Sequence, residues 1–156
     1  MVPRKPECLI VGLGNSYRSD DAVGLVLAGR LKSRMGTNAE VLEFHGEPLD
    51  LLDIWSGFRK VILIDAATGG GNPGSIHRFE AHQSPISSRA IHFSSHQLNI
   101  PAAIELARTL DKLPPEIIVY GVEAASFSAG TSLSSEVEKA LTLLEDQIMK
   151  EVRVSE

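Results

Sequence analysis

The stretch Lys60-Val-Ile-Leu-Ile-Asp65 is the clearest strand in the sequence, and it decides the fold. Four aliphatic residues run without interruption into an acid, which is the pattern of a strand buried on both faces of a sheet. Cys8-Leu-Ile-Val-Gly-Leu13 is a second continuous apolar run of the same kind. Strands of this type occur in mostly parallel sheets that helices cover on both sides.

Shorter strands and longer helices alternate along the rest of the chain. Strand patterns occur at residues 39–44, 75–80 and 117–122. Helical apolar spacing occurs from about Asp20 to Met35, near Leu49 to Trp55, from about Asn99 to Lys112 and from Ser134 to Val152. Ser19 or Asp20 is predicted to cap the first helix, whereas residues 81–95 show neither period. This order predicts an α/β fold, a three-layer α/β/α sandwich with an open, mostly parallel five-stranded sheet and helices on both faces, in one domain over residues 1–156.

Composition and charge exclude several classes of function. The chain has 156 residues, of which 43% are hydrophobic and 22% are charged, as in a globular domain. Its net charge of −5 offers no basic face to a phosphate backbone, so nucleic acid is not expected as a partner. The apolar run near the N-terminus is too short for a signal peptide or a membrane span. With one cysteine, Cys8, no internal disulfide can form, and we expect a cytoplasmic protein.

Two acidic positions and a histidine are predicted to meet at one edge of the sheet. In open α/β sheets the ligand crevice lies beyond the carboxyl ends of the strands, where the strand order reverses. If the second and third strands lie on opposite sides of the first, that reversal lies between the first and third strands. Asp20 and Asp21 follow the first strand, Asp65 ends the third, and His96 lies in the loop after the fourth. Two carboxylates and an imidazole make an open divalent-metal site with room for water or substrate.

Each of these residues also has a purely structural interpretation. One of Asp20 and Asp21 is expected to cap the helix, Asp65 can accept bonds from loop amides, and a single histidine such as His96 more often packs or caps. We assign the remaining histidines to structural roles. The convergence of three positions on one crevice favours a chemical role for them.

Nucleophilic catalysis is poorly supported by the sequence. Cys8 begins a buried strand, where a thiol is unreactive. None of the serines occupies a Gly-x-Ser-x-Gly turn between a strand and a helix. Hydrolysis would therefore use a water molecule activated by a metal ion or a carboxylate.

Several motifs resemble those of the hydrogenase maturation peptidases. The stretch from Ile10 to Gly24, Ile-Val-Gly-Leu-Gly-Asn-Ser-Tyr-Arg-Ser-Asp-Asp-Ala-Val-Gly, is similar to the opening motif of that family. Further matching segments follow in the same order: Leu63-Ile-Asp-Ala66, Ser95-His-Gln-Leu98, Val119-Tyr-Gly-Val-Glu123 and Leu133-Ser-Ser-Glu-Val-Glu-Lys-Ala140. The resemblance covers nearly the whole chain, and the combination is much more specific than any one segment.

The resemblance implies an endopeptidase that removes the C-terminal extension of a nickel–iron hydrogenase large-subunit precursor after nickel insertion. The two acids and the histidine that bind metal in the family correspond to Asp21, Asp65 and His96, which we take as metal ligands and catalytic residues. The family often has glutamate at the first position, so Asp20 is an alternative first ligand. Nickel is expected to arrive with the precursor, and other divalent ions could occupy the isolated site.

Substrate contacts are assigned to three positions near the first strand. Gly14 and Asn15 are expected to form the floor of the cleft, where loop amides face a developing oxyanion, and Asp20 is placed beside them. The loops at Gly69–Gly74 and at residues 81–95 are expected to contact the precursor, because they lack any period and follow strands.

Three other functions compete with this interpretation. A nucleotide-binding domain would need a third glycine after Gly12 and Gly14, and Asp20 and Asp21 would repel a pyrophosphate. A peptidyl-tRNA hydrolase, whose opening Val11-Gly-Leu-Gly-Asn15 also resembles, would need a His-Asn pair and a basic face for tRNA. A nickel-binding chaperone or sensor could use the same ligands without turnover, and the sequence leaves this alternative open.

Overall fold

The structure is a computed structural model that describes residues 6–15, 19–87, 91–93, 100–127, 130 and 132–154. The strands are β1 (Cys8–Leu13), β2 (Glu40–Phe44), β3 (Lys60–Thr68), β4 (Ile76–Glu80), β5 (His92–Phe93) and β6 (Glu116–Glu123). The helices are α1 (Val23–Met35), α2 (Leu51–Ile54), α3 (Ile100–Thr109) and α4 (Ser135–Val154), with 3-10 turns η1 (Ser19–Ala22) and η2 (Pro48–Asp50).

The sheet has the order β2-β1-β3-β6-β4, and β5 pairs with the end of β3 outside this path. β2, β1, β3 and β6 are parallel, whereas β4 runs antiparallel to β6. The predicted fold class is therefore confirmed. The second and third strands lie on opposite sides of β1, so the strand order reverses between β1 and β3, as predicted.

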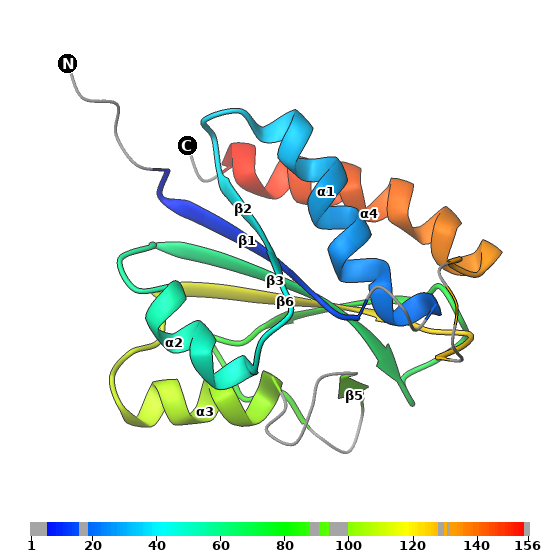
Figure 1. Cartoon of the computed structure of the whole chain (residues 1–156). Coiled ribbons are helices and arrows are strands. Elements are labelled where there is room, and N and C mark those ends of the chain that lie inside the picture. Colours follow the sequence, from blue (N-terminus) through cyan, green and yellow to red (C-terminus); the bar gives the residue numbers. More distant parts are fainter. Residues whose placement is uncertain are drawn as a thin grey trace.

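Helices cover both faces of the sheet (Figure 1). Alternate residues of the central strands point to opposite faces, as the strand period requires. Ile10 and Ile62 face α1 and α4, whereas Val11 and Leu63 face the layer that contains α2 and α3. Both sets are buried, which explains why these strands read as continuous apolar runs. Among the described residues, the structure has no helix long and apolar enough to cross a membrane.

The structure departs from the sequence predictions at two places. The predicted cap by Ser19 or Asp20 is wrong, because both residues lie in η1 and α1 begins after Ala22 without a side-chain cap bond. Residues 81–95 include β5, a two-residue strand that is too short to show a period. The predicted start of the third helix at Asn99 lies outside the described residues.

A pair of glycines lets α1 approach the sheet closely. A Cβ atom on Gly12 of β1 would lie 2.0 Å from the carbonyl oxygen of Gly24 in α1. A Cβ atom on Gly24 would lie 2.3 Å from the oxygen of Leu13 and 2.4 Å from that of Ile64. Such distances leave no room for a side chain, so the first turn of α1 lies directly on the carboxyl ends of β1 and β3.

We expect Gly24→Ala to lower the free energy of unfolding by about 3 kcal/mol, because the new methyl group would collide with main-chain oxygens that cannot rotate away. Gly29→Ala is the matched control in the same helix, since its Cβ would meet nothing closer than 3.6 Å, at Glu43. Because Gly29 occupies an exposed helical position, alanine there should raise the free energy of unfolding by up to about 1 kcal/mol. Urea unfolding measures the change in the free energy of unfolding for each variant. An equal change for the two substitutions would contradict the close packing of α1 against the sheet.

Candidate functional site

Asp65 lies at the carboxyl edge of the sheet, on β3. Pairing with β1 extends to Ile64, so Asp65 is the first residue of β3 beyond it, while on the other side it pairs with Gly121 of β6. The Asp65 side chain is fully buried, and its Oδ1 accepts a hydrogen bond of 2.9 Å from the Ala66 amide. The acid therefore stands where the strand order reverses, at the position that open α/β sheets use for ligands.

Asp21 reaches the same edge from the loop after β1. Its side chain is buried, at 3% exposure, and the turn η1 that carries it contacts β3. The Asn15 amide donates a 3.1 Å hydrogen bond to the carbonyl oxygen of Asp21, and a Cβ on Gly14 would lie 2.0 Å from that oxygen. Gly14 and Asn15 thus fold back onto Asp21 and hold its main chain, and their predicted contacts with substrate remain predictions.

His96, the third member of the predicted site, lies outside the described residues. The chain is anchored shortly before it, because Phe93 of β5 pairs with Ala67 of β3, two residues beyond Asp65. Two residues lie between Phe93 and His96, and the three Cα–Cα steps that join Phe93 to His96 span at most about 11 Å. Asp65 therefore lies within the covalent reach of this segment.

The donor types of the predicted site suit a divalent ion of the first transition row. Carboxylate oxygens and an imidazole nitrogen are ligands that such ions accept, and three of them leave coordination positions open. In the predicted site, Asp21 and Asp65 would supply the two carboxylates. Within the described part of the chain, no group of three or more His, Cys, Asp or Glu side chains is placed to hold a metal ion. The ligand set therefore depends on His96.

Asp20 has a different environment from Asp21. Its side chain is fully buried, and its two oxygens accept hydrogen bonds at 2.7 to 3.0 Å from the connection between β6 and α4. The donors are the amides of Ala125, Ser126 and Ser134 and the hydroxyl of Ser134. The Asp20 amide also donates to the Ser126 carbonyl at 3.1 Å. Asp20 therefore joins η1 to the segment that follows β6, and its predicted role beside the substrate remains a prediction.

A further acid, Glu123, lies at this edge of the sheet, and no role is predicted for it from the sequence. Glu123 ends β6 with 2% exposure, and its Oε1 accepts hydrogen bonds from the Gly70 amide at 2.6 Å and from Nε2 of His77 at 3.0 Å. His77 was assigned to a structural role from sequence. No local sequence pattern predicts the contact between Glu123 and His77, because the two residues lie on different strands. They are brought together only by the antiparallel pairing of β4 with β6.

A hollow in the described surface lies at the opposite end of the sheet. It has a volume of about 490 Å³ and is lined by residues that precede β3 and β6, among them Trp55, Arg59 and Pro114. The candidate acids follow the strands rather than precede them. The candidate site is therefore at the carboxyl edge, which holds the buried carboxylates Asp21 and Asp65, and not in this hollow.

We expect Asp20→Ala to lower the free energy of unfolding by about 3 kcal/mol, because three amides and a hydroxyl would lose their buried acceptor. Asp53→Ala is the control, since Asp53 is exposed on α2, and its effect should stay within about 0.5 kcal/mol. Urea or thermal unfolding provides the comparison. A loss below 1 kcal/mol for Asp20→Ala would show that these bonds do not hold η1 in place.

The thiol of Cys8 should be unreactive in the folded protein. Burial raises the pKa of the Cys8 thiol to about 11, although nearby Lys60 opposes this shift. We expect slow alkylation by iodoacetamide at pH 8 in the native protein and fast alkylation in urea. Because the folded pKa lies above the ordinary value of 9.0, the stability linked to the protonated thiol is complete below pH 9 and is lost as pH rises through 11. Fast labelling of the native protein at pH 8 would contradict the closed environment of β1.

Comparisons with known proteins place the chain in a family. A family model described as hydrogenase maturation protease matches residues 26–151. The chain is 28% identical over 158 residues to a putative hydrogenase maturation protease of Methanocaldococcus jannaschii, covering 96% of this chain and 99% of that protein. It is 26% identical to the hydrogenase expression/formation protein HupD of Thiocapsa roseopersicina over 88% of this chain, and it spans 63% of HupD.

The fold is also that of solved structures. The NiFe hydrogenase maturation protease HybD from Thermococcus kodakarensis is similar with a TM-score of 0.73 and 25% identity, over 93% of this chain and 98% of that chain. The family model includes Asp65 and the segment of His96, while Asp21 precedes its first matched residue. From the extent of the family match, this chain belongs to the hydrogenase maturation protease family.

Proposed function

We propose that this protein is an endopeptidase that removes the C-terminal extension of a nickel–iron hydrogenase large-subunit precursor after nickel has been inserted. Membership of the family supports the class of reaction. The observation that carries the proposal is the placement of two buried acids, Asp21 and Asp65, at the carboxyl edge between β1 and β3. Carboxylate oxygens are ligands that divalent ions accept, so two acids at one edge suit an ion-binding role.

Nickel enters this scheme as part of the precursor. Asp21, Asp65 and His96 would bind the ion through two carboxylates and an imidazole, and would leave positions for the ligands that the precursor itself provides. A precursor without nickel would offer these side chains no ion. Cleavage would then follow insertion, because productive binding needs the loaded substrate.

The hydrolysis step needs a water molecule and a proton acceptor. The oxygen of water attacks the scissile carbonyl carbon, and a carboxylate of the site, from Asp21 or Asp65, accepts the proton. The carbon–nitrogen bond then breaks, and the proton passes to the leaving amine. Gly14 and Asn15, which pack against the main chain of Asp21, are the proposed floor on which the precursor segment lies.

Cleavage of a purified precursor tests this proposal. We expect the protein to shorten a nickel-loaded large-subunit precursor and to leave a nickel-free one intact, as measured by intact mass. Asp65→Asn and His96→Ala should each lower the rate by at least about 10²-fold, because each removes a ligand or a proton acceptor. Asp53→Asn, on the exposed side of α2, is the control and should cleave at the wild-type rate.

Two outcomes would contradict the proposal in different ways. Undiminished cleavage by both Asp65→Asn and His96→Ala would show that the reaction takes place elsewhere. Nickel binding that depends on Asp65 and His96, without any cleavage of the loaded precursor, would instead favour the chaperone or sensor.

A further inference from the structure

The hydrogen-bonded pair of buried Glu123 and half-buried His77 lies outside the proposed ion site. Oε1 of Glu123 bonds to the Gly70 amide and to Nε2 of His77, and only 3% of the Glu123 side chain is exposed. A carboxylate in such a position is costly to bury unless its hydrogen bonds are satisfied. The bond from Gly70 to Glu123 therefore fixes the position of the Gly70 main chain.

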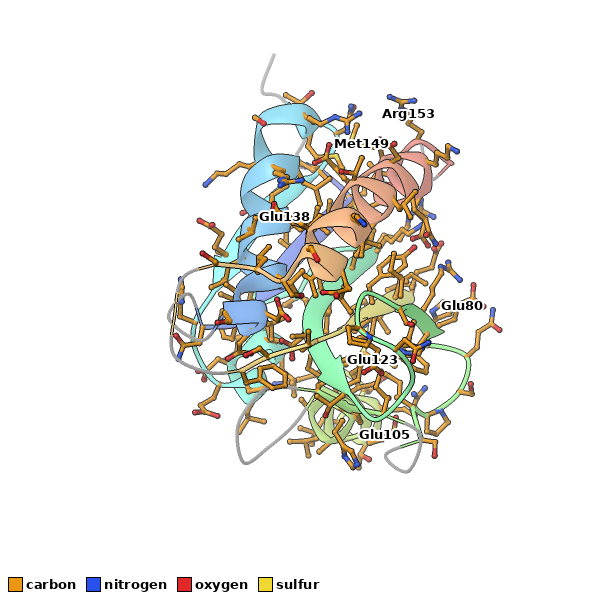
Figure 2. The ribbon with its side chains drawn as sticks, turned by 90° about the vertical axis from the view of Figure 1, so that its right-hand side faces the viewer. Glu80, Glu105, Glu123, Glu138, Met149 and Arg153 are labelled. Atoms are coloured by element: carbon orange, nitrogen blue, oxygen red, sulfur yellow. The ribbon has the colours of Figure 1, made fainter. Side chains whose placement is uncertain are left out.

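What it bonds to is the glycine-rich loop, Gly69–Gly74, which follows β3. The Glu123 side chain holds the start of the loop at Gly70, and the main chain of Glu123 holds its end. The carbonyl oxygen of Glu123 accepts a 2.8 Å bond from the Gly74 amide, and its own amide donates a 2.9 Å bond to the Ser75 carbonyl. One residue thus fixes both ends of the loop. In Figure 2 Glu123 lies between α4, marked by Glu138, and α3, marked by Glu105.

The fit of the loop around this pair is close enough to require glycine. A Cβ on Gly70 would lie 2.7 Å from Oε1 of Glu123 and 2.8 Å from Nε2 of His77. Gly74 has a φ of +85°, and its Cβ would lie 2.6 Å from the main-chain oxygen of Glu136 at the start of α4. The loop is therefore bonded to the end of β6 and packs closely against the start of α4.

Two apolar side chains pack between His77 and Asp65. Asp65 and His77 are each directly paired with Gly121 of β6, one from each side, so the three residues lie in one row on the same face of the sheet. Above Gly121 pack Ile91 and Phe93, at 3.0 and 3.1 Å from the position of a Cβ.

The glycine-rich loop presents exposed residues next to the site. It begins four residues after Asp65, and Gly71, Asn72 and Pro73 are exposed. A loop held in one conformation loses little conformational entropy when a partner binds to it. The main-chain groups of such a loop suit an extended polypeptide segment.

From these contacts we propose that Glu123 is a positioning residue that holds the glycine-rich loop in the conformation that binds the polypeptide segment of the precursor around the scissile bond. This proposal rests on the proposed function. Glu123 acts through the loop, and His77 completes its hydrogen bonds, so the residue should affect substrate binding and not the chemical step.

The test compares Glu123→Leu with Glu123→Gln in the precursor cleavage assay. Leucine removes the acceptor, and we expect KM to rise about tenfold with kcat within twofold of wild type, since one charged hydrogen bond orders the loop. Glutamine keeps an oxygen that can accept from Gly70 and should restore KM to within about threefold. Glu80→Leu, an exposed glutamate of β4 that pairs with Arg78, is the control and should leave both constants unchanged. Hydrogen exchange at the Gly70 amide should quicken in Glu123→Leu, which reports that the loop has been released while the fold persists.

The outcomes that contradict the role of Glu123 differ from those that contradict the proposed endopeptidase function. If the wild type cleaves the loaded precursor and Glu123→Leu has an unchanged KM, the proposal is overturned while the endopeptidase assignment stands. A fall in kcat with unchanged KM also overturns it, because Glu123 would then act on the chemistry. If the wild type does not cleave the loaded precursor, the proposed function is overturned, and the role of Glu123, which rests on it, is overturned with it.

Discussion

The close contact between α1 and the sheet at Gly12 and Gly24 is the constraint on which the site depends. Main-chain atoms of the helix meet main-chain oxygens of Leu13 and Ile64, so the position of the helix is set by hard contacts rather than by adjustable side chains. η1 immediately precedes this helix, and Asp65 immediately follows Ile64. The contact that sets the helix therefore also brings the Asp21 main chain to the edge where Asp65 stands.

Buried carboxylates then hold the loops around this edge. Asp20 joins η1 to the connection between β6 and α4, and Glu123 joins the end of β6 to the glycine-rich loop. Three of the four donors to Asp20 are main-chain amides, and the Glu123 side chain accepts from one main-chain amide and one imidazole. A charged acceptor gives stronger hydrogen bonds than a neutral one. A site built on loops can be as well defined as one built on strands when its loops are held in this way.

The sequence predicts the central part of this arrangement well and its connections poorly. The fold follows from the continuous apolar runs of β1 and β3, because burial on both faces leaves a local signal, and the edge that holds Asp21 and Asp65 then follows from the topology. The roles of Asp20 and Glu123 cannot be predicted in this way. The partner Ser134 lies more than a hundred residues after Asp20, and the partner Gly70 lies about fifty residues before Glu123. The pattern Asp20-Asp21 before an apolar helix is that of a cap, but the Asp20 carboxylate binds the more distant amides of Ala125 and Ser134 instead. A single sequence gives no signal for such long-range pairs.

The neighbouring acids at this edge illustrate how one residue type serves separate purposes. Asp20 and Asp21 are adjacent in the chain and both are buried, yet both oxygens of Asp20 are engaged by the β6–α4 connection. A carboxylate surrounded by amide and hydroxyl donors has little capacity left for an ion, since those donors occupy the lone pairs that a metal would use. The geometry therefore favours Asp21 over Asp20 as the first ligand of the proposed site. That preference comes from the hydrogen bonds of Asp20, and it agrees with the sequence prediction, which took Asp21 as the ligand and Asp20 as the alternative.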